Sequence, residues 1–167
     1  MRQENSKPVN GCGCLVLLMC IGVLTAIALP SYLSSVNGGK QSEGKHYISF
    51  MNKTQQAKFA KKGAFSDHIP DLGLDIETKT KWYKYSIRAT DKAAFNYGVS
   101  KQEGPKSYVG GVFVVPAKAV EPNAAQDEMT TTSILCETDS DGTIKPAEPI
   151  YLNGKVICGK GTTQVTK

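Results

Sequence analysis

An acidic run near the C-terminus contains the residues of this chain that are best suited to hold a ligand. From Glu137 to Glu148 the sequence ETDSDGTIKPAE places acids at the first, third, fifth and twelfth positions and a glycine at the sixth. This is the spacing of a calcium loop, in which hard oxygen ligands converge around a glycine turn. The candidate calcium ligands are therefore Glu137, Asp139, Asp141 and Glu148.

Other features of the same run favour a simpler interpretation. A calcium loop normally begins with aspartate, whereas this one begins with Glu137, and Pro146 stiffens its second half. The flanking residues are typical of strands and not of helices. We therefore favour an acidic hairpin turn without a cofactor and keep calcium as the alternative.

The five cysteines fall into two groups. Cys12, Cys14 and Cys20 lie in or beside an apolar segment, whereas Cys136 and Cys158 lie in the C-terminal quarter. If that quarter lies outside the cytoplasm, Cys136 and Cys158 are the natural disulfide pair. In a cytoplasmic domain they would instead be two reduced, buried thiols.

Residues typical of catalysis are sparse. His46 is isolated on a predicted helix, and His68 is isolated in a predicted loop beside Asp67. The sequence contains no glycine-rich phosphate loop and no cysteine spacing typical of zinc. We expect both histidines to be solvated or to cap turns, and the chain not to be an enzyme.

The apolar segment indicates a membrane anchor. From Gly11 to Leu29 no residue is charged, and crossing the hydrocarbon core takes about 20 such residues. The alternatives are a cleaved signal peptide, with a weak site at residues 25–28, or a buried core helix. Arg2 and Lys7 precede the segment, so the positive-inside rule predicts a single-pass inner-membrane protein with a cytoplasmic N-terminus and a periplasmic C-terminal domain.

The remaining sequence predicts a small α+β domain. The chain has 167 residues and a net charge of +5, enough for one anchor and one domain but far from a dedicated nucleic-acid surface. Apolar residues recur at helical spacing up to Lys62, weakened by Gly38–Gly44, and Gly63 ends the pattern. The apolar positions of this helix are Tyr32, Leu33, Val36, Tyr47, Ile48, Met51, Phe59 and Ala60.

Four lysines lie on the opposite side of this helix, as a solvated face or as a patch for the phosphates of DNA: Lys53, Lys58, Lys61 and Lys62. After a loop at 64–80, alternating residues predict an antiparallel sheet. Its strands are expected at 82–89, 95–99, 108–115, 131–136 and 155–158, with a turn at 151–154 and a loop or short helix at 117–128. The predicted organisation is a cytoplasmic segment (1–10), a transmembrane helix (11–29) broken at Pro30, its amphipathic continuation (30–62) and a globular domain (63–167).

The run IGVLTAIALPSY, residues 21–32, resembles the N-terminal helix of type IV pilins and pseudopilins. Residues 40–43, 51–57 and 72–74 are similar to cyanobacterial pilin-like proteins of the general secretion G/H type. The resemblance implies a long N-terminal helix packed on a small antiparallel sheet. It also implies partners among pilus or secretion subunits, reached through the helix, where small residues let helices approach closely. The residues in question are Gly22, Thr25 and Ala26, just before Pro30.

The N-terminus departs from the pilin pattern. Aligned on Pro30, the glutamate near the start of the pilin helix falls on Gly13, and the leader's glycine falls on Pro8. We therefore expect the chain to stay in the membrane, or to join a filament only as a minor subunit of a type IV pilus or type II secretion-like apparatus. The alternative is a stand-alone tethered module that binds calcium, a glycan or DNA. No small-molecule substrate is expected.

Overall fold

The computed structural model describes residues 11–73 and 78–166, although the side chains of 11–14 and 27–35 lie outside the described part. The predicted cytoplasmic segment, 1–10, also lies outside it. Contacts divide the chain into two compact units, an N-terminal one that ends at Asn37 and a C-terminal one that begins at Gly38.

Helix α1 (Gly11–Lys62) runs through Pro30 without interruption, so the break expected there is wrong. A proline removes one backbone hydrogen bond, and the turns on either side continue the helix. No helix within the described residues is both long and apolar enough to cross a membrane. The anchor predicted at 11–29 includes residues whose side chains are not described.

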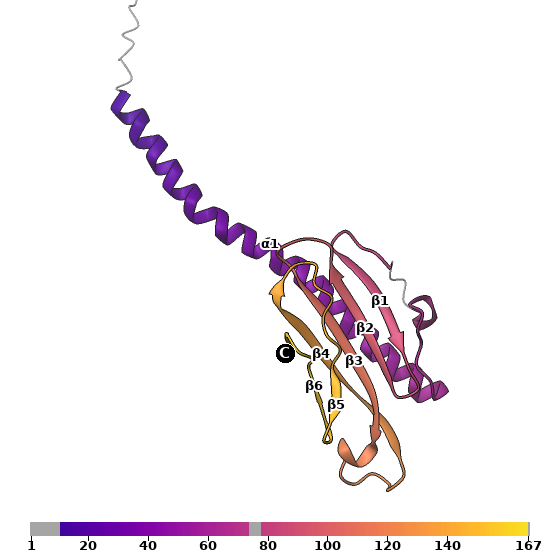
Figure 1. Ribbon diagram of the computed structural model, residues 1–167. Coiled ribbons are helices and arrows are strands. Elements are labelled where there is room, and N and C mark those ends of the chain that lie inside the picture. Colours follow the sequence, from indigo (N-terminus) through magenta and orange to yellow (C-terminus); the bar gives the residue numbers. More distant parts are fainter. Residues whose placement is uncertain (1–10, 74–77, 167) are drawn as a thin grey trace, which may run out of the picture. The chain divides into compact units, whose positions relative to one another are not determined.

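In the C-terminal unit, α1 packs on an antiparallel sheet (Figure 1). This confirms the predicted α+β class. The strand order within the described residues is β1-β2-β3-β4-β7, and β5 and β6 form a separate hairpin. The strands are β1 (Tyr83–Ala89), β2 (Ala93–Ser100), β3 (Lys106–Pro116), β4 (Met129–Asp141), β5 (Ile150–Leu152), β6 (Lys155–Ile157) and β7 (Thr162–Gln164). Two short 3-10 helices, η1 (Pro70–Leu72) and η2 (Ala117–Ala119), complete the unit.

The sheet has two buried faces. On the helix face, Tyr83, Tyr85 and Tyr108 pack against Ile48 and Met51 of α1. The outer face is built from β2, β3 and β4 and is covered by irregular chain and the β5–β6 hairpin. Its residues are Phe95, Tyr97, Val109, Phe113, Ile134 and Cys136, with Tyr151, Val156 and Cys158 packed on them.

Most element boundaries agree with the expectations. Helix α1 ends at Lys62, and Gly63 follows with φ 67° and a 2.7 Å bond from its N–H to Phe59 O. The expected turn at 151–154 joins β5 to β6, with positive φ at Asn153 and Gly154. Strand β7 was not expected, and β4 extends five residues further, to Asp141, than the predicted 131–136.

Candidate functional site

The first candidate surface is the apolar stretch at the start of α1. In the N-terminal unit, the large side chains from Leu15 to Leu24 are each between 49% and 66% exposed. Gly22 has nothing within 4 Å of its Cβ position, and Thr25 bonds back to the carbonyls of Ile21 and Gly22. A helix that exposes aliphatic residues in this way needs an apolar environment or a partner helix. Of the predicted assembly residues, Gly22 lies in this stretch, and Thr25 and Ala26 follow directly after it.

In the C-terminal unit, Gly44 lets α1 approach the sheet closely. A Cβ at this position would lie 2.7 Å from Tyr108 Cδ2 and 2.8 Å from Tyr83 Cζ. Both tyrosines are fully buried, and burial raises the pKa of each phenol well above its usual value. Gly44 was expected only to weaken the helix, but in the structure it is a point of close contact between helix and sheet. The role of Gly44 is set by Tyr83 of β1 and Tyr108 of β3, which are distant in sequence, so the local pattern does not indicate it.

Two buried asparagines connect the helix to the sheet. Asn52 Nδ2 donates to Ile134 O over 2.9 Å, and Asn96 Nδ2 donates to Asn52 Oδ1 over 2.8 Å. Gly110 provides the space, because a Cβ there would lie 2.1 Å from Asn52 Oδ1. Burying amides is unfavourable unless they are bonded, so this pair fixes the register of α1 on the sheet. No pattern in the sequence singled out these two asparagines.

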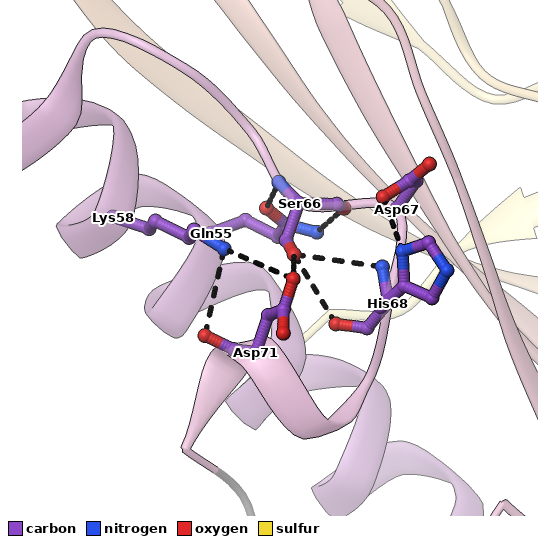
Figure 2. A network of polar contacts seen from close by, with 6 residues as sticks. All are labelled: Gln55, Lys58, Ser66, Asp67, His68 and Asp71. Atoms are coloured by element: carbon purple, nitrogen blue, oxygen red, sulfur yellow. Dashed lines mark hydrogen bonds and ion pairs between the residues drawn. The ribbon is translucent and has the colours of Figure 1, made fainter.

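A second polar network fastens the loop after α1 (Figure 2). The Gln55 side chain is fully buried and bonds twice to the Ser66 backbone, to O over 2.7 Å and from N over 2.9 Å. Ser66 Oγ contacts Asp71 Oδ2, and Lys58 Nζ lies 3.9 Å from the same oxygen. The glutamine thus acts as a capping group for a loop that has few backbone bonds of its own.

The same network shows why His68 is not paired with a nucleophile. Ser66 Oγ contacts the backbone of His68, whereas the His68 ring lies against Asp67, with Nδ1 2.5 Å from Oδ1 (Figure 2). This hydrogen bond lowers the pKa of the exposed Asp67 carboxyl. His46, on α1, stacks on Phe50. In the part of the chain that the structure describes, neither ring forms a hydrogen bond with a hydroxyl group.

Cys136 and Cys158, the predicted pair, form a disulfide. Their Cα atoms are 5.8 Å apart, and the bond joins β4 to the chain just after β6. Cys136 is fully buried in the outer face. The bond therefore holds the β5–β6 hairpin on the sheet. Cys20 is exposed in the N-terminal unit as a free thiol.

The four candidate calcium ligands are not brought together. Glu137, Asp139 and Asp141 alternate along β4 and so share one side of that strand. Glu137 is held by Lys45 at 3.5 Å and by Lys106 at 2.8 Å, whereas Glu148 lies on the outer face. Over the described ranges, no group of three or more His, Cys, Asp or Glu is placed to hold a metal. The first half of the run, as far as Asp141, is part of strand β4, so it does not have the shape of the calcium loop that was kept as the alternative.

Glu148 is instead the centre of an outer-face cluster. Its carboxylate accepts a 2.7 Å bond from Arg88 Nε, a second from Arg88 Nη2 and a third from the Tyr97 hydroxyl. The bond from Arg88 is the main cause that lowers the pKa of Glu148. Burial, reinforced by this carboxylate, raises the pKa of Tyr97 to about 12. The cluster pins the segment between β4 and β5 to the sheet.

The four lysines of the predicted phosphate patch do not share one role. Lys58 has a side chain that is 17% exposed and pairs with Asp71, while Lys53, Lys61 and Lys62 are exposed. Lys58 is therefore paired within the protein and does not contribute a free charge to a phosphate-binding patch. The remaining three have the solvated positions expected of a helix surface.

A long N-terminal helix with an exposed apolar start, packed on an antiparallel sheet whose outer cover is fastened by a disulfide, is the architecture of a pilin-like protein. Residues 41–159 match the family described as type IV pilin-like G and H, and the chain belongs to this family. The match confirms the resemblance to type IV pilin-like proteins and includes the segments 51–57 and 72–74.

One similar protein is the type IV major pilin protein PilA of Myxococcus xanthus (strain DK1622). It is 31% identical over 96 residues, which cover 54% of this chain and 44% of the pilin. The match thus spans less than half the length of that relative. No solved structure matches the chain.

Proposed function

We propose that this chain is a non-enzymatic, membrane-anchored subunit of a type IV pilus or a type II secretion-like apparatus, present as a minor or accessory component. The observation that carries the proposal is the exposed apolar stretch from Leu15 to Leu24 in a helix that continues into the pilin-like unit. Aliphatic side chains exposed in this way are stable in a bilayer or against another apolar helix. Family membership and the similarity to a major pilin support a role in such an assembly.

The minor or accessory role follows from the sequence of the N-terminal segment. In a filament core, a carboxylate on one helix and the free amino terminus of a neighbour can neutralise each other, and either alone in an apolar core costs several kcal/mol. Gly13 occupies the carboxylate position here. We therefore propose that the N-terminus stays at the cytoplasmic side of the inner membrane and the C-terminal unit lies in the periplasm.

The test separates anchoring from filament membership. Val23→Lys should move the chain out of the alkali-resistant membrane fraction, because a central lysine costs about 3 kcal/mol of insertion free energy. Val36→Lys, beyond the predicted anchor, is the matched control and should leave the chain in that fraction. Wild-type protein in the soluble fraction would overturn the anchor.

Immunogold labelling of sheared pili then tests the subunit role. We expect sparse labelling together with co-purification of pilus or secretion components. Uniform labelling along the filaments would overturn the minor role, and the absence of any such component would favour a stand-alone tethered module. The intact mass of the protein from its own cells shows whether residues 1–8 are retained.

A further inference from the structure

A hairpin at the end of the C-terminal unit where α1 enters it displays several cations. Residues 78–85 turn back on themselves, closed by a 2.9 Å bond from Thr80 N to Tyr83 O. Lys81 and Trp82 therefore occupy the tip. The turn is fastened to α1, since Thr80 Oγ1 donates to the carboxylate of Glu43 over 2.5 Å. The tip is thus a fixed feature of the unit.

Lysines approach the tryptophan from separate elements. Lys40 Nζ, from α1, lies 4.4 Å from the centroid of the Trp82 ring, and Lys81 Nζ lies 4.5 Å from it. Lys101, just beyond β2, donates to Thr80 O over 2.8 Å. We call this region the Trp82 surface, and its members are Lys40, Lys79, Lys81, Trp82, Lys84 and Lys101.

Within residues 11–73 and 78–166, no carboxylate forms an ion pair with the lysines of this surface. Lys79 and Lys84 are both exposed and directly opposite each other in an antiparallel bridge, an arrangement that is unfavourable for like charges. Lysines on an edge strand prevent it from pairing with another chain, which explains Lys84 on the edge strand β1. This does not explain Lys40 on α1 or Lys101 beyond β2. The arrangement is suited to an anionic partner.

The position of the surface along the chain indicates which anion. Lys40 follows Leu29, the last residue of the predicted anchor, by eleven residues, and eleven residues of helix measure about 16 Å, so the length of chain between them allows Lys40 to reach the headgroup layer. Tryptophan is favoured at membrane interfaces, and lysines are attracted to anionic leaflets. We propose that the Trp82 surface binds the phosphodiester headgroups of anionic phospholipids. This inference rests on the proposed membrane anchor.

The experiment uses Trp82 as its own reporter, because it is the single tryptophan of the chain. The full-length protein is reconstituted in vesicles of brominated phosphatidylcholine, alone or in equal parts with brominated phosphatidylglycerol. We expect blue-shifted, quenched Trp82 emission only with phosphatidylglycerol, and its reversal in about 1 M salt, where the Debye length is about 3 Å. Flotation with pure phosphatidylcholine vesicles reports the anchor separately. Flotation without a Trp82 response to phosphatidylglycerol overturns this inference alone.

Matched variants locate the interaction. Replacing Lys79, Lys81, Lys84 and Lys101 by glutamine should abolish the response, since each lysine near an anionic surface contributes about a fivefold change in partitioning. The control has the same net charge and replaces lysines on other surfaces, namely Lys53, Lys61, Lys62 and Lys118. It should respond like the wild type. An equal loss in both variants would mean that only total charge matters and would overturn the proposal.

Two further additions, each made to phosphatidylcholine vesicles, distinguish other sources of phosphate. Neither duplex DNA nor glycerol phosphate should change the emission of Trp82. A response to DNA that phosphatidylglycerol does not produce would assign the surface to nucleic acid. A response to glycerol phosphate at low concentration would assign it to a soluble phosphate ligand.

Discussion

The two faces of the sheet are covered in different ways. Over the helix face, α1 supplies Ile48, Met51, Asn52 and Gln55 at regular helical spacing, and all four are buried. Over the outer face, the cover is irregular chain between β4 and β7 with one short hairpin. It is attached at separate points, by the disulfide, by Glu148 on Arg88 and Tyr97, and by Pro149 against Gly111.

The comparison shows that the type of segment covering a face of the sheet determines how that segment is held in place. A helix brings a new side chain to the same face about every 3.6 residues, so its regular backbone repeats the contact with the sheet at every turn. Irregular chain has no such period, and each contact must be secured by a bond of its own. We therefore expect the outer face to depend on a few strong attachments, and the helix face on many shared ones.

Removing the disulfide should have the largest effect. Replacing Cys136 and Cys158 by alanine should lower the free energy of unfolding by about 3 kcal/mol in the chain-entropy model for a loop of this length. Urea denaturation measures this, and hydrogen exchange should rise in β5 and β6 before it rises in α1. Cys20→Ala, which changes an exposed thiol, is the control. Equal stability of the double variant would contradict the dependence of the outer face on this bond.

Neighbouring glycines allow a direct comparison of the faces. Gly110→Ala would place a Cβ 2.1 Å from Asn52 Oδ1, and Gly111→Ala would place one 2.5 Å from Pro149 Cγ. We expect Gly110→Ala to lower the free energy of unfolding by about 2 kcal/mol, because it also disrupts buried hydrogen bonds. Gly111→Ala should cost about 1 kcal/mol, since the irregular chain can shift. Thermal melting with urea titration measures both losses. A larger loss for Gly111→Ala than for Gly110→Ala would contradict the proposed difference between the two faces.

The Glu148 cluster should give a smaller, pH-dependent effect. Its pKa is lowered in the folded state, so its stabilising contribution is present above the ordinary glutamate pKa and is lost as the pH falls through the lowered value. Glu148→Gln should cost about 0.5 kcal/mol at neutral pH, because Arg88 is half exposed and solvent screens the pair. The variant should lose less stability than the wild type on acidification. Parallel pH profiles of the two proteins would contradict this.

Calcium should have the smallest effect. Glu137 is engaged by Lys45 and Lys106, and Glu148 by Arg88, so the acids of the run are spread over separate contacts. We expect the same melting temperature in millimolar calcium and in chelator. A calcium-induced rise that disappears in the Asp139→Asn, Asp141→Asn variant would establish a site in this run.

Much of the fold could be predicted because it is encoded locally. Alternating residues identified β1, β2 and β3, and Gly63 marked the end of α1. The Asn153-Gly154 pair marked the turn between β5 and β6. These features depend on residues that are neighbours in sequence.

The remainder depends on contacts between distant segments. Asn52 and Gln55 are polar residues on the buried side of α1, and their partners lie outside the helix. Ile134 and Asn96 bond to Asn52, and Ser66 bonds to Gln55. Strand β7 is short and polar, so neither periodicity nor composition distinguishes it from a loop. The acidic run matched a loop motif, but pairing with β3 makes its first half a strand. None of these outcomes is contained in a local pattern.

The bond between Cys136 and Cys158 also makes the maturation of the protein depend on its surroundings. Reducing compartments keep such thiols apart, whereas oxidising ones join them. Before oxidation, the chain around β5 and β6 is held by Glu148 and by the apolar contacts of the outer face, while α1 can already pack on the other face. The order of assembly would then be helix first and cover last, with the last step timed by arrival in an oxidising compartment.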